Sequence, residues 1–315
     1  PITPPGQEEE TQPPQVIPWG VDRIDAELTW STSNGTGIKV AVLDTGIDYT
    51  HPDLDENVKG GVNIINPRRD YKDDNGHGTH CAGIIAAENN DIGVVGVAPE
   101  VWLYAVKVLN RQGLGFVSDV IAGIDWCVDN GMQIVSMSLG GGYSEGLKEA
   151  CDNAYAAGLI LVAAAGNEGD GDPTTDEYSY PAAYDSVIAV GATDNTDVAP
   201  SWSNSGPYLE LAAPGVEITS TWLDGDYRNL SGTSMACPHV SGTAALILAT
   251  SDDAVLDLNG DGVPETNGDG VWMNTEVRNV LQAASDDLGP EGWDSTYGYG
   301  LVDAEESTTG IQTSP

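Results

Sequence analysis

Basic residues are scarce in this sequence. It carries 11 Lys and Arg against 49 Asp and Glu, so its 315 residues hold a formal net charge of −38. A surface this acidic repels phosphates and anionic lipids, which argues against a nucleic-acid-binding protein and against a peripheral membrane protein. It also needs salt or divalent cations to weaken its own repulsion. We therefore interpret the chain as an extracellular protein from a salty habitat, with an ordinary acidic secreted protein as the alternative.

Long hydrophobic runs and a cysteine framework are missing as well. No stretch reaches the roughly 18 apolar residues that a membrane-spanning helix needs. The four cysteines are too few for a disulfide scaffold, and their spacing matches no zinc ribbon. Because the sequence starts at Pro1 without a charged and then apolar leader, we expect any signal peptide or pro-segment to have been removed.

Apolar segments of strand length are present, and they alternate with segments of helical spacing. This alternation predicts βαβ units and therefore the α/β fold class, a mostly parallel sheet with helices on both faces. The length allows one large domain or two small ones. We predict strands at residues 38–44, 101–109, 134–139, 159–165 and 187–190, and helices at 77–88, 118–130, 147–157, 234–249 and from about 274.

Changes of composition suggest where the folded domain lies. Residues 1–14 are acidic and proline-rich, which is typical of a flexible tail. We expect the domain to span residues 15–305 and a short C-terminal tail to follow at 306–315. Within the domain, residues 250–271 form a polar insertion rich in Asp, Asn and Gly.

Three short motifs place polar side chains where chemistry could occur. Asp44 ends an apolar strand, at the sheet edge where active sites form, although a turn aspartate would show the same pattern. His77 starts a predicted helix between two glycines, and imidazole suits proton transfer near neutral pH. The alternatives for His77 are helix capping and metal binding. Ser234 precedes a long apolar helix, where a serine is usually only a cap.

Taken together, these motifs resemble the three catalytic blocks of the subtilisin-like serine proteases. The matching segments are DTGID from Asp44, HGTHCAG from His77 and GTSMACPHVSG from Gly232. Linking segments are similar too, so the resemblance spans about residues 15–303. It implies a subtilisin-like three-layer sandwich and a secreted endopeptidase. The order Asp, His, Ser excludes the chymotrypsin type, in which His comes first.

The resemblance also implies a role for each matching residue. Ser234 would be the nucleophile, His77 the general base and then acid, and Asp44 the group that orients the imidazole. Asn167 matches the side chain that donates to the oxyanion together with the Ser234 backbone N–H, and a simple turn residue is the alternative. The implied partners are polypeptide substrates and the chain's own pro-segment, as folding aid and inhibitor. We expect a monomer with no nucleic-acid or membrane partner.

The substrate implied by the resemblance is a peptide held extended between two backbone segments. Backbone pairing gives affinity without reading sequence, so we expect broad specificity. The substrate-binding residues would be Gly113, Leu114, Gly115, Ser138, Leu139, Gly140, Ala165, Gly166 and Glu168. Glu168 would lie at the rim of the primary pocket, with Asp170 and Asp172 close behind. This predicts a modest preference for Lys or Arg over Glu at the residue before the cut.

Calcium is the cofactor that the resemblance implies. The first site would use the Asp53 carboxylate, because carboxylate and carbonyl oxygens are the ligands that Ca²⁺ prefers. The other ligands would be the side chains of Gln15 and Asn90 and the backbone carbonyls of Glu88, Ile92 and Val94.

The insertion predicts a second calcium site from the residues themselves. Oxygen-bearing positions alternate, with Gly262 sixth, as in the first half of an EF-hand loop. The candidate ligands are Asp257, Asn259, Asp261, Val263 and Glu265. The twelfth position is Gly268 instead of Glu, so Asp252, Asp253 or Asp269 would have to complete the site. A solvated acidic loop is the alternative. A third, weaker candidate is the group Asp70, Asp73 and Asp74.

The four cysteines are not candidates for the nucleophile, because Ser234 occupies that position. Cys81 and Cys237 are expected to be buried and inert. In the implied fold, Cys127 and Cys151 lie on neighbouring helices, and whether they form a disulfide stays open.

Two rival functions remain to be compared with the serine protease. An aspartic protease is one rival, but it needs two motifs of the type found once at Asp44. The other rival is a calcium-dependent adhesion module on a degenerate protease fold.

Overall fold

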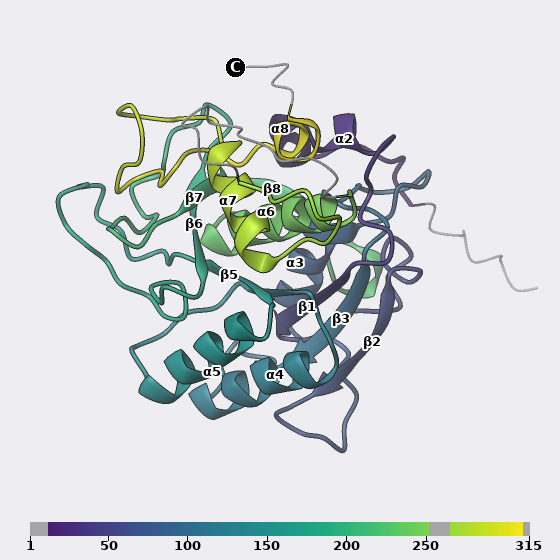
Figure 1. The fold of residues 1–315 in the computed structure, drawn as a ribbon. Helices are drawn as coiled ribbons and strands as arrows, with labels where there is room; N and C mark the ends of the chain where they lie inside the picture. The colour runs from purple at the N-terminus through teal and green to yellow at the C-terminus, as the bar shows by residue number, and fades with distance from the viewer. Residues whose placement is uncertain (1–11, 252–264, 311–315) are drawn as a thin grey trace, which may run out of the picture.

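The computed structural model describes residues 12–251 and 265–310. Its centre is a seven-stranded parallel sheet with the strand order β2-β3-β1-β4-β5-β6-β7 (Figure 1). An antiparallel hairpin, β8-β9, lies apart from it. The strands are β1 (Lys39–Asp44), β2 (Val58–Asn63), β3 (Trp102–Lys107), β4 (Ile134–Met137), β5 (Ile160–Ala164), β6 (Ile188–Thr193), β7 (Leu211–Pro214), β8 (Ile218–Thr221) and β9 (Tyr227–Leu230).

Helices cover both faces of this sheet, so the α/β prediction is confirmed. Figure 1 shows α4 and α5 together on one face, with α3, α6 and α7 on the other. The short helices α2 and α8 pack against each other at the rim. The helices are α1 (Trp19–Arg23), α2 (Ala26–Thr29), α3 (His77–Ala86), α4 (Val117–Asp129), α5 (Glu145–Ala156), α6 (Thr233–Leu248), α7 (Asn274–Ala283) and α8 (Ala304–Thr309).

Strand β1 shows why the sheet is buried on both sides. Successive side chains of a strand point to opposite faces. Val40 and Val42 join the apolar core beneath α3 and α6, whereas Ala41 and Leu43 join the core beneath α4 and α5. A strand with two buried faces needs a continuous apolar run, which is the pattern that made β1 predictable.

The order of the strands positions the candidate site. Because the strands are parallel, their carboxyl ends lie along one edge of the sheet, where ligands bind in open α/β sheets. Asp44 ends β1, Ser138 follows β4, and the turn containing Asn167 follows β5. Since β1, β4 and β5 are consecutive in the sheet, these three residues come to one region.

Several elements differ from the sequence prediction. Strand β2 was not predicted, because its sequence VKGGVN lacks an apolar run and sits half-exposed at the sheet edge. Strand β7 and the β8-β9 hairpin were also not predicted; each of these strands has four residues. The predicted strands and helices are otherwise present, with ends that differ by a few residues.

Residues near both predicted tail boundaries contact the domain. Pro14 forms a bridge with Ile92, so the ordered chain begins before residue 15. Helix α8 runs to Thr309, across the expected boundary at 305, because its buried residues Ala304 and Ser307 pack onto the domain. Residues 1–11, 252–264 and 311–315 lie outside the described part, and with them most of the insertion.

All four cysteines are buried and free. The open question of a Cys127–Cys151 disulfide is therefore answered in the negative. Burial raises the pKa of the Cys151 thiol to about 12, which makes it inert as a nucleophile. Among the described residues, no helix is both long and apolar enough to cross a membrane.

Candidate active site

Asp44 and His77 face each other across the junction of β1 and α3. The His77 Nδ1–H donates to the carboxylate, with both Asp44 oxygens 2.9 Å away. The Asp44 side chain is fully buried, and it also accepts from the Thr45 N–H at 2.7 Å. A buried carboxylate on Nδ1 fixes the ring so that Nε2 is the nitrogen left for proton transfer.

Glycines on both sides of His77 allow α3 to approach β1 this closely. A Cβ at Gly78 would lie 2.2 Å from the Gly46 carbonyl oxygen and 3.0 Å from the Asp44 Cβ. Gly76 has a φ of 111°, and a Cβ there would lie 2.3 Å from the Trp222 ring. A larger residue at Gly78 would push α3 away from β1, and one at Gly76 would clash with Trp222.

Ser234 lies at the second position of α6, which packs against α3. Its hydroxyl donates to the Ser138 carbonyl oxygen at 3.4 Å. The first N–H groups of a helix have no intrahelical acceptor, so the Ser234 N–H is available to a ligand. The helix dipole also favours negative charge at this end.

Asn167 lies beside Ser234, in the turn after β5. Its side-chain oxygen accepts from the Thr233 N–H at 2.9 Å and from the Thr233 hydroxyl at 3.0 Å. These two bonds fix the amide and leave its NH₂ group facing outward. Asn167 and Ser234 line the same hollow. The Ser234 N–H and the Asn167 NH₂ group are therefore two hydrogen-bond donors beside one hollow.

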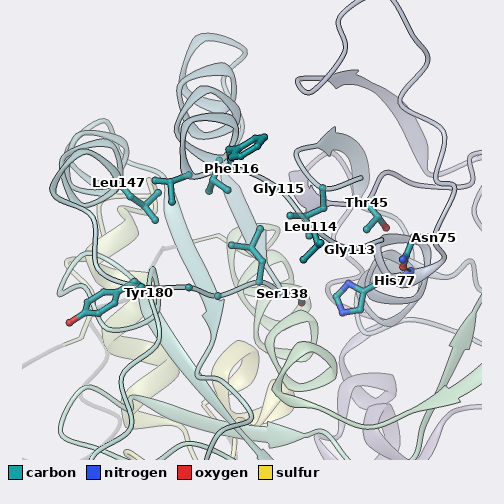
Figure 2. A pocket seen from close by; sticks show the side chains of 17 residues that line it. Thr45, Asn75, His77, Gly113, Leu114, Gly115, Phe116, Ser138, Leu147 and Tyr180 are labelled. Carbon is teal, nitrogen blue, oxygen red and sulfur yellow. Dashed lines mark hydrogen bonds between the residues drawn. The ribbon is translucent and has the colours of Figure 1, made fainter. Parts of the chain in front are cut away.

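The site opens into two connected hollows. The first, which we call the cleft, has a volume of about 480 Å³ and includes His77, Leu114 and Ser138. Figure 2 shows His77 and Asn75 at one end of the cleft and Tyr180 and Leu147 at the other. The predicted substrate residues Gly113, Leu114, Gly115, Ser138, Leu139 and Gly140 all line it. Its length and backbone-rich walls suit an extended peptide.

The second hollow, which we call the side pocket, has a volume of about 440 Å³ and lies next to Ser234. Gly166 and Glu168 line it, as the sequence analysis expected. Ala165 does not, because its side chain is fully buried in the core beneath α4 and α5. Successive residues of β5 and its extension point to opposite faces, so Ala164 and Gly166 line the pocket while Ala165 between them does not.

Glu177 is a lining residue of the side pocket that sequence reasoning missed. It comes from the loop after Asp172, and its Oε2 accepts from the Ser205 N–H at 3.0 Å. Asp170 and Asp172 were expected near this pocket, but neither is among its lining residues. The loop carries no motif, so nothing in the sequence distinguished Glu177 from its acidic neighbours.

Asp53 is fully buried and forms the centre of the first candidate calcium site. Its oxygens accept from the Asn90 amide at 3.0 Å and from the Val94 N–H at 3.0 Å. The segment around Gln15 runs beside this loop, with Gln15 N–H donating to the Asp91 carbonyl at 3.2 Å. The Gln15 side chain donates instead to Asn89.

The donor set around Asp53 fits a hard cation. Burial raises the pKa of Asp53 to about 6, and the hydrogen bonds from Val94 and Asn90 offset this effect only in part. Glu88, Ile92 and Val94, whose carbonyl groups are the other expected ligands, belong to the same loop. Since the Asn90 NH₂ group faces Asp53, a bound cation would need this amide to present its oxygen instead.

The second candidate metal site lies mostly outside the described residues, and the third is not brought together. Asp257, Asn259, Asp261 and Val263 lie outside the described residues, as do Asp252 and Asp253. Glu265 is described and buried. The carboxylates of the third group bind separate protein partners, so they form no shared cation site. Asp70 accepts from Tyr49, Asp73 from Thr79, and Asp74 pairs with Lys107.

Comparison with known proteins gives a consistent result. A sequence model described as the subtilase family matches residues 35–300. Subtilisin Savinase of Lederbergia lenta is 43% identical over 296 residues, which cover 93% of this chain and 99% of that protein. An alkaline protease of Alkalihalobacillus alcalophilus is 43% identical over 302 residues, covering 95% of this chain and 72% of its own. Subtilisin E of Bacillus subtilis is 43% identical over 294 residues, covering 92% and 71%.

Proposed function

The chain belongs to the subtilase family and is a serine endopeptidase, and from this premise we propose that Asp44, His77 and Ser234 form its catalytic triad. The observation that carries the proposal is the buried Asp44 carboxylate, 2.9 Å from His77 Nδ1. His77 lines the cleft, and Ser234 lines the side pocket that shares Ser138 with it. Membership of this family removes the aspartic protease as an alternative. The presence of Asp44, His77, Asn167 and Ser234 together argues against an adhesion module on a degenerate protease fold.

The geometry supports acyl transfer in ordinary steps. His77 Nε2 takes the Ser234 proton while the hydroxyl oxygen attacks the peptide carbonyl carbon, and Asp44 stabilises the imidazolium. The carbonyl oxygen becomes an oxyanion, which accepts from the Ser234 N–H and the Asn167 NH₂ group. His77 then gives the proton to the leaving amine. Water repeats the sequence on the acyl-enzyme and releases the acid.

The remaining parts of the proposal concern setting and partners. We propose a secreted, monomeric enzyme that is synthesised with a pro-segment acting as folding aid and inhibitor. Calcium would be structural, held at Asp53 and in the insertion. A net charge of −38 supports adaptation to salt, because screening shortens the range of like-charge repulsion. The catalytic domain would run from about residue 15 through the end of α8, with residues 250–271 as an insertion.

The pH dependence of catalysis tests the Asp44–His77 pair. Burial alone would lower the pKa of His77, but the Asp44 carboxylate outweighs it and holds that pKa well above 6.5. Since only neutral imidazole accepts the Ser234 proton, kcat/KM should rise with pH through a midpoint above 6.5. The measurement is kcat/KM for a peptide substrate from pH 5 to 10.

The other histidines do not complicate this profile. His80 and His239 are buried, and burial lowers the pKa of each to about 4. The pKa of His51 is lowered for the same reason. A rising limb with its midpoint at or below 6.5 would mean that Asp44 does not stabilise the imidazolium, and the proposed roles of this pair would fail.

Substrate preference tests the side pocket. Glu168 and Glu177 both line it, and within the described part of the chain neither forms an ion pair with Lys or Arg. A substrate cation there gains roughly 1 kcal/mol or less from each exposed carboxylate. We expect kcat/KM to favour Lys or Arg over Glu before the cut by up to about tenfold at low salt, with apolar residues still accepted.

Three variants test whether these carboxylates cause the preference: Glu168→Gln, Glu177→Gln and the double variant. Their kcat/KM values for Lys and Glu peptides are compared at low and at molar NaCl. The preference should shrink in the variants and in salt, because both reduce the field at the pocket. Asp172→Asn is the matched control, since Asp172 carries the same charge but does not line the pocket. Equal rates for Lys and Glu peptides at low salt would contradict the prediction.

A further inference from the structure

Lys107 is a buried cation close to the candidate triad that the reaction itself does not use. It ends β3, and only 4% of the residue is exposed. Its parallel partner in β1 is Asp44. A buried ammonium is costly unless hydrogen bonds and an opposite charge compensate for its lost hydration. The groups that satisfy this one therefore indicate what it holds in place.

The two partners of the ammonium belong to the two segments that carry Asp44 and His77. Lys107 Nζ donates to the backbone carbonyl of Thr45, the residue directly after Asp44. It also donates to Asp74 Oδ1 at 2.7 Å. Asp74 lies in the loop that leads into α3, three residues before His77. One side chain thus ties the end of β1 to the start of α3.

Thr45 connects this ammonium to the Asp44 carboxylate. Its N–H donates to Asp44 Oδ1 at 2.7 Å, and its hydroxyl accepts from the Gly78 N–H at 3.0 Å. Thr45 is fully buried, so without Lys107 its carbonyl would lose a donor that water could not readily replace. A shift of Thr45 would move its N–H and hydroxyl with it, and both position the Asp44–His77 pair.

The loop on the other side of the ammonium is connected to His77 in a similar way. Asn75 Oδ1 accepts from the His77 N–H at 3.1 Å, and the Asn75 N–H donates to Asp73 at 2.9 Å. Asp74 lies between Asp73 and Asn75 in the chain, and its side chain is 55% exposed. Its pairing with Lys107 adds a side-chain contact between this loop and the buried end of β1, beside the backbone bond from the Asp73 N–H to the Ile47 carbonyl at 3.2 Å.

We infer that Lys107 is a positioning residue for peptide hydrolysis, whose ammonium fixes the Asp44 turn against the loop preceding His77. The inference rests on the proposed roles of Asp44 and His77. It concerns kcat, because the ammonium contacts two supporting residues and lines neither the cleft nor the side pocket. Misplacing catalytic groups by about 1 Å can cost roughly 10²-fold in rate, so the expected effect is measurable.

Lys107→Met removes the charge and keeps the length of the side chain. We expect kcat to fall about 10- to 100-fold, with KM changed less than about twofold. Rates are divided by the concentration of sites that react with a serine-directed organophosphate. A merely structural role would lower the number of reactive sites and the melting temperature while leaving the rate per site intact. The downfield ¹H NMR signal of the His77 Nδ1–H should shift or broaden in this variant.

Three further variants complete the design. Lys148→Met is the matched control, because it removes the same charge from a surface pair with Asp152 and should leave the rate per site unchanged. Lys107→Arg should recover part of the lost rate, since it keeps the cation. Asp74→Asn breaks the tie to the loop at a half-exposed position, and we expect a loss of about threefold or more in kcat.

An unchanged rate per site in Lys107→Met overturns the inference. If that variant does not fold, Asp74→Asn decides in its place, and an unchanged rate there has the same meaning. Failure of the triad assignment would look different, because Ser234→Ala would then remain active whatever happens at Lys107.

Discussion

Replacing Ser234 by alanine should abolish peptide hydrolysis and leave the fold intact. The hydroxyl is the proposed nucleophile, and its loss removes covalent catalysis altogether. We expect kcat to fall by several orders of magnitude. The oxyanion donors and substrate binding would still supply a small residual rate. The measurement is casein cleavage together with organophosphate labelling followed by mass spectrometry. Wild type should gain one adduct, on Ser234, and the variant none.

Ser241→Ala is the matched control on the same helix. The Ser241 hydroxyl is buried and donates to Ser136 at 2.9 Å, away from both hollows. Its loss should lower stability modestly and leave the rate and the labelling unchanged. Cleavage of casein by Ser234→Ala at close to the wild-type rate would show that another residue is the nucleophile.

The sequence predicted the part of this site that depends on strand ends. Asp44 follows a continuous apolar run, and such a run indicates a strand buried on both faces. The carboxyl end of that strand lies at the edge of a parallel sheet where catalytic residues gather. Ser234 alone gave only a weak signal, since a serine before a long apolar helix is usually a cap. The motif order then joined three segments that are far apart in the chain.

The parts that sequence reasoning missed depend on the paths of loops and on the face of a strand to which each side chain points. Glu177 enters the side pocket only because its loop folds back toward Ser205, and no local pattern encodes that path. Ala165 was placed on the wrong side because alternation along β5 decides which of two small neighbours faces the pocket. Lys107 gave no signal, since a lysine at the end of an apolar strand usually reaches solvent. Only the placement of Thr45 and Asp74 shows why this one is buried.

Tertiary contacts also decided the ends of the domain. A proline-rich segment predicts a tail, yet Pro13 and Pro14 are held by the loop 91–94. The polar residues of α8 gave no apolar stripe, because the helix is short and buries only small side chains. In both cases the stabilising partner lies far away in sequence.

Removing calcium should lower thermal stability sharply. Asp53 is fully buried among amide donors, and a cation at this carboxylate would supply the missing positive charge. A ligand that binds only the native state adds RT ln(1+[L]/Kd), about 4 kcal/mol at a thousandfold excess over Kd. We therefore expect EDTA to lower the melting temperature, and added Ca²⁺ to restore it. Thermal unfolding of the Ser234→Ala protein is the measurement, because that variant does not digest itself.

Variants at the two candidate calcium sites separate the contribution of each site to the melting temperature. Asp53→Asn should melt, even in Ca²⁺, close to the EDTA-treated protein, and its response to EDTA should be smaller. Asp261→Ala should lose a further part of the response if the insertion binds calcium. Asp70→Asn is the control, since that carboxylate is exposed and accepts from Tyr49. The same melting temperature with and without EDTA, in the parent and in all three variants, would mean that these oxygens hold no stabilising cation. Burial of Asp53 would then be an uncompensated cost that the rest of the fold carries.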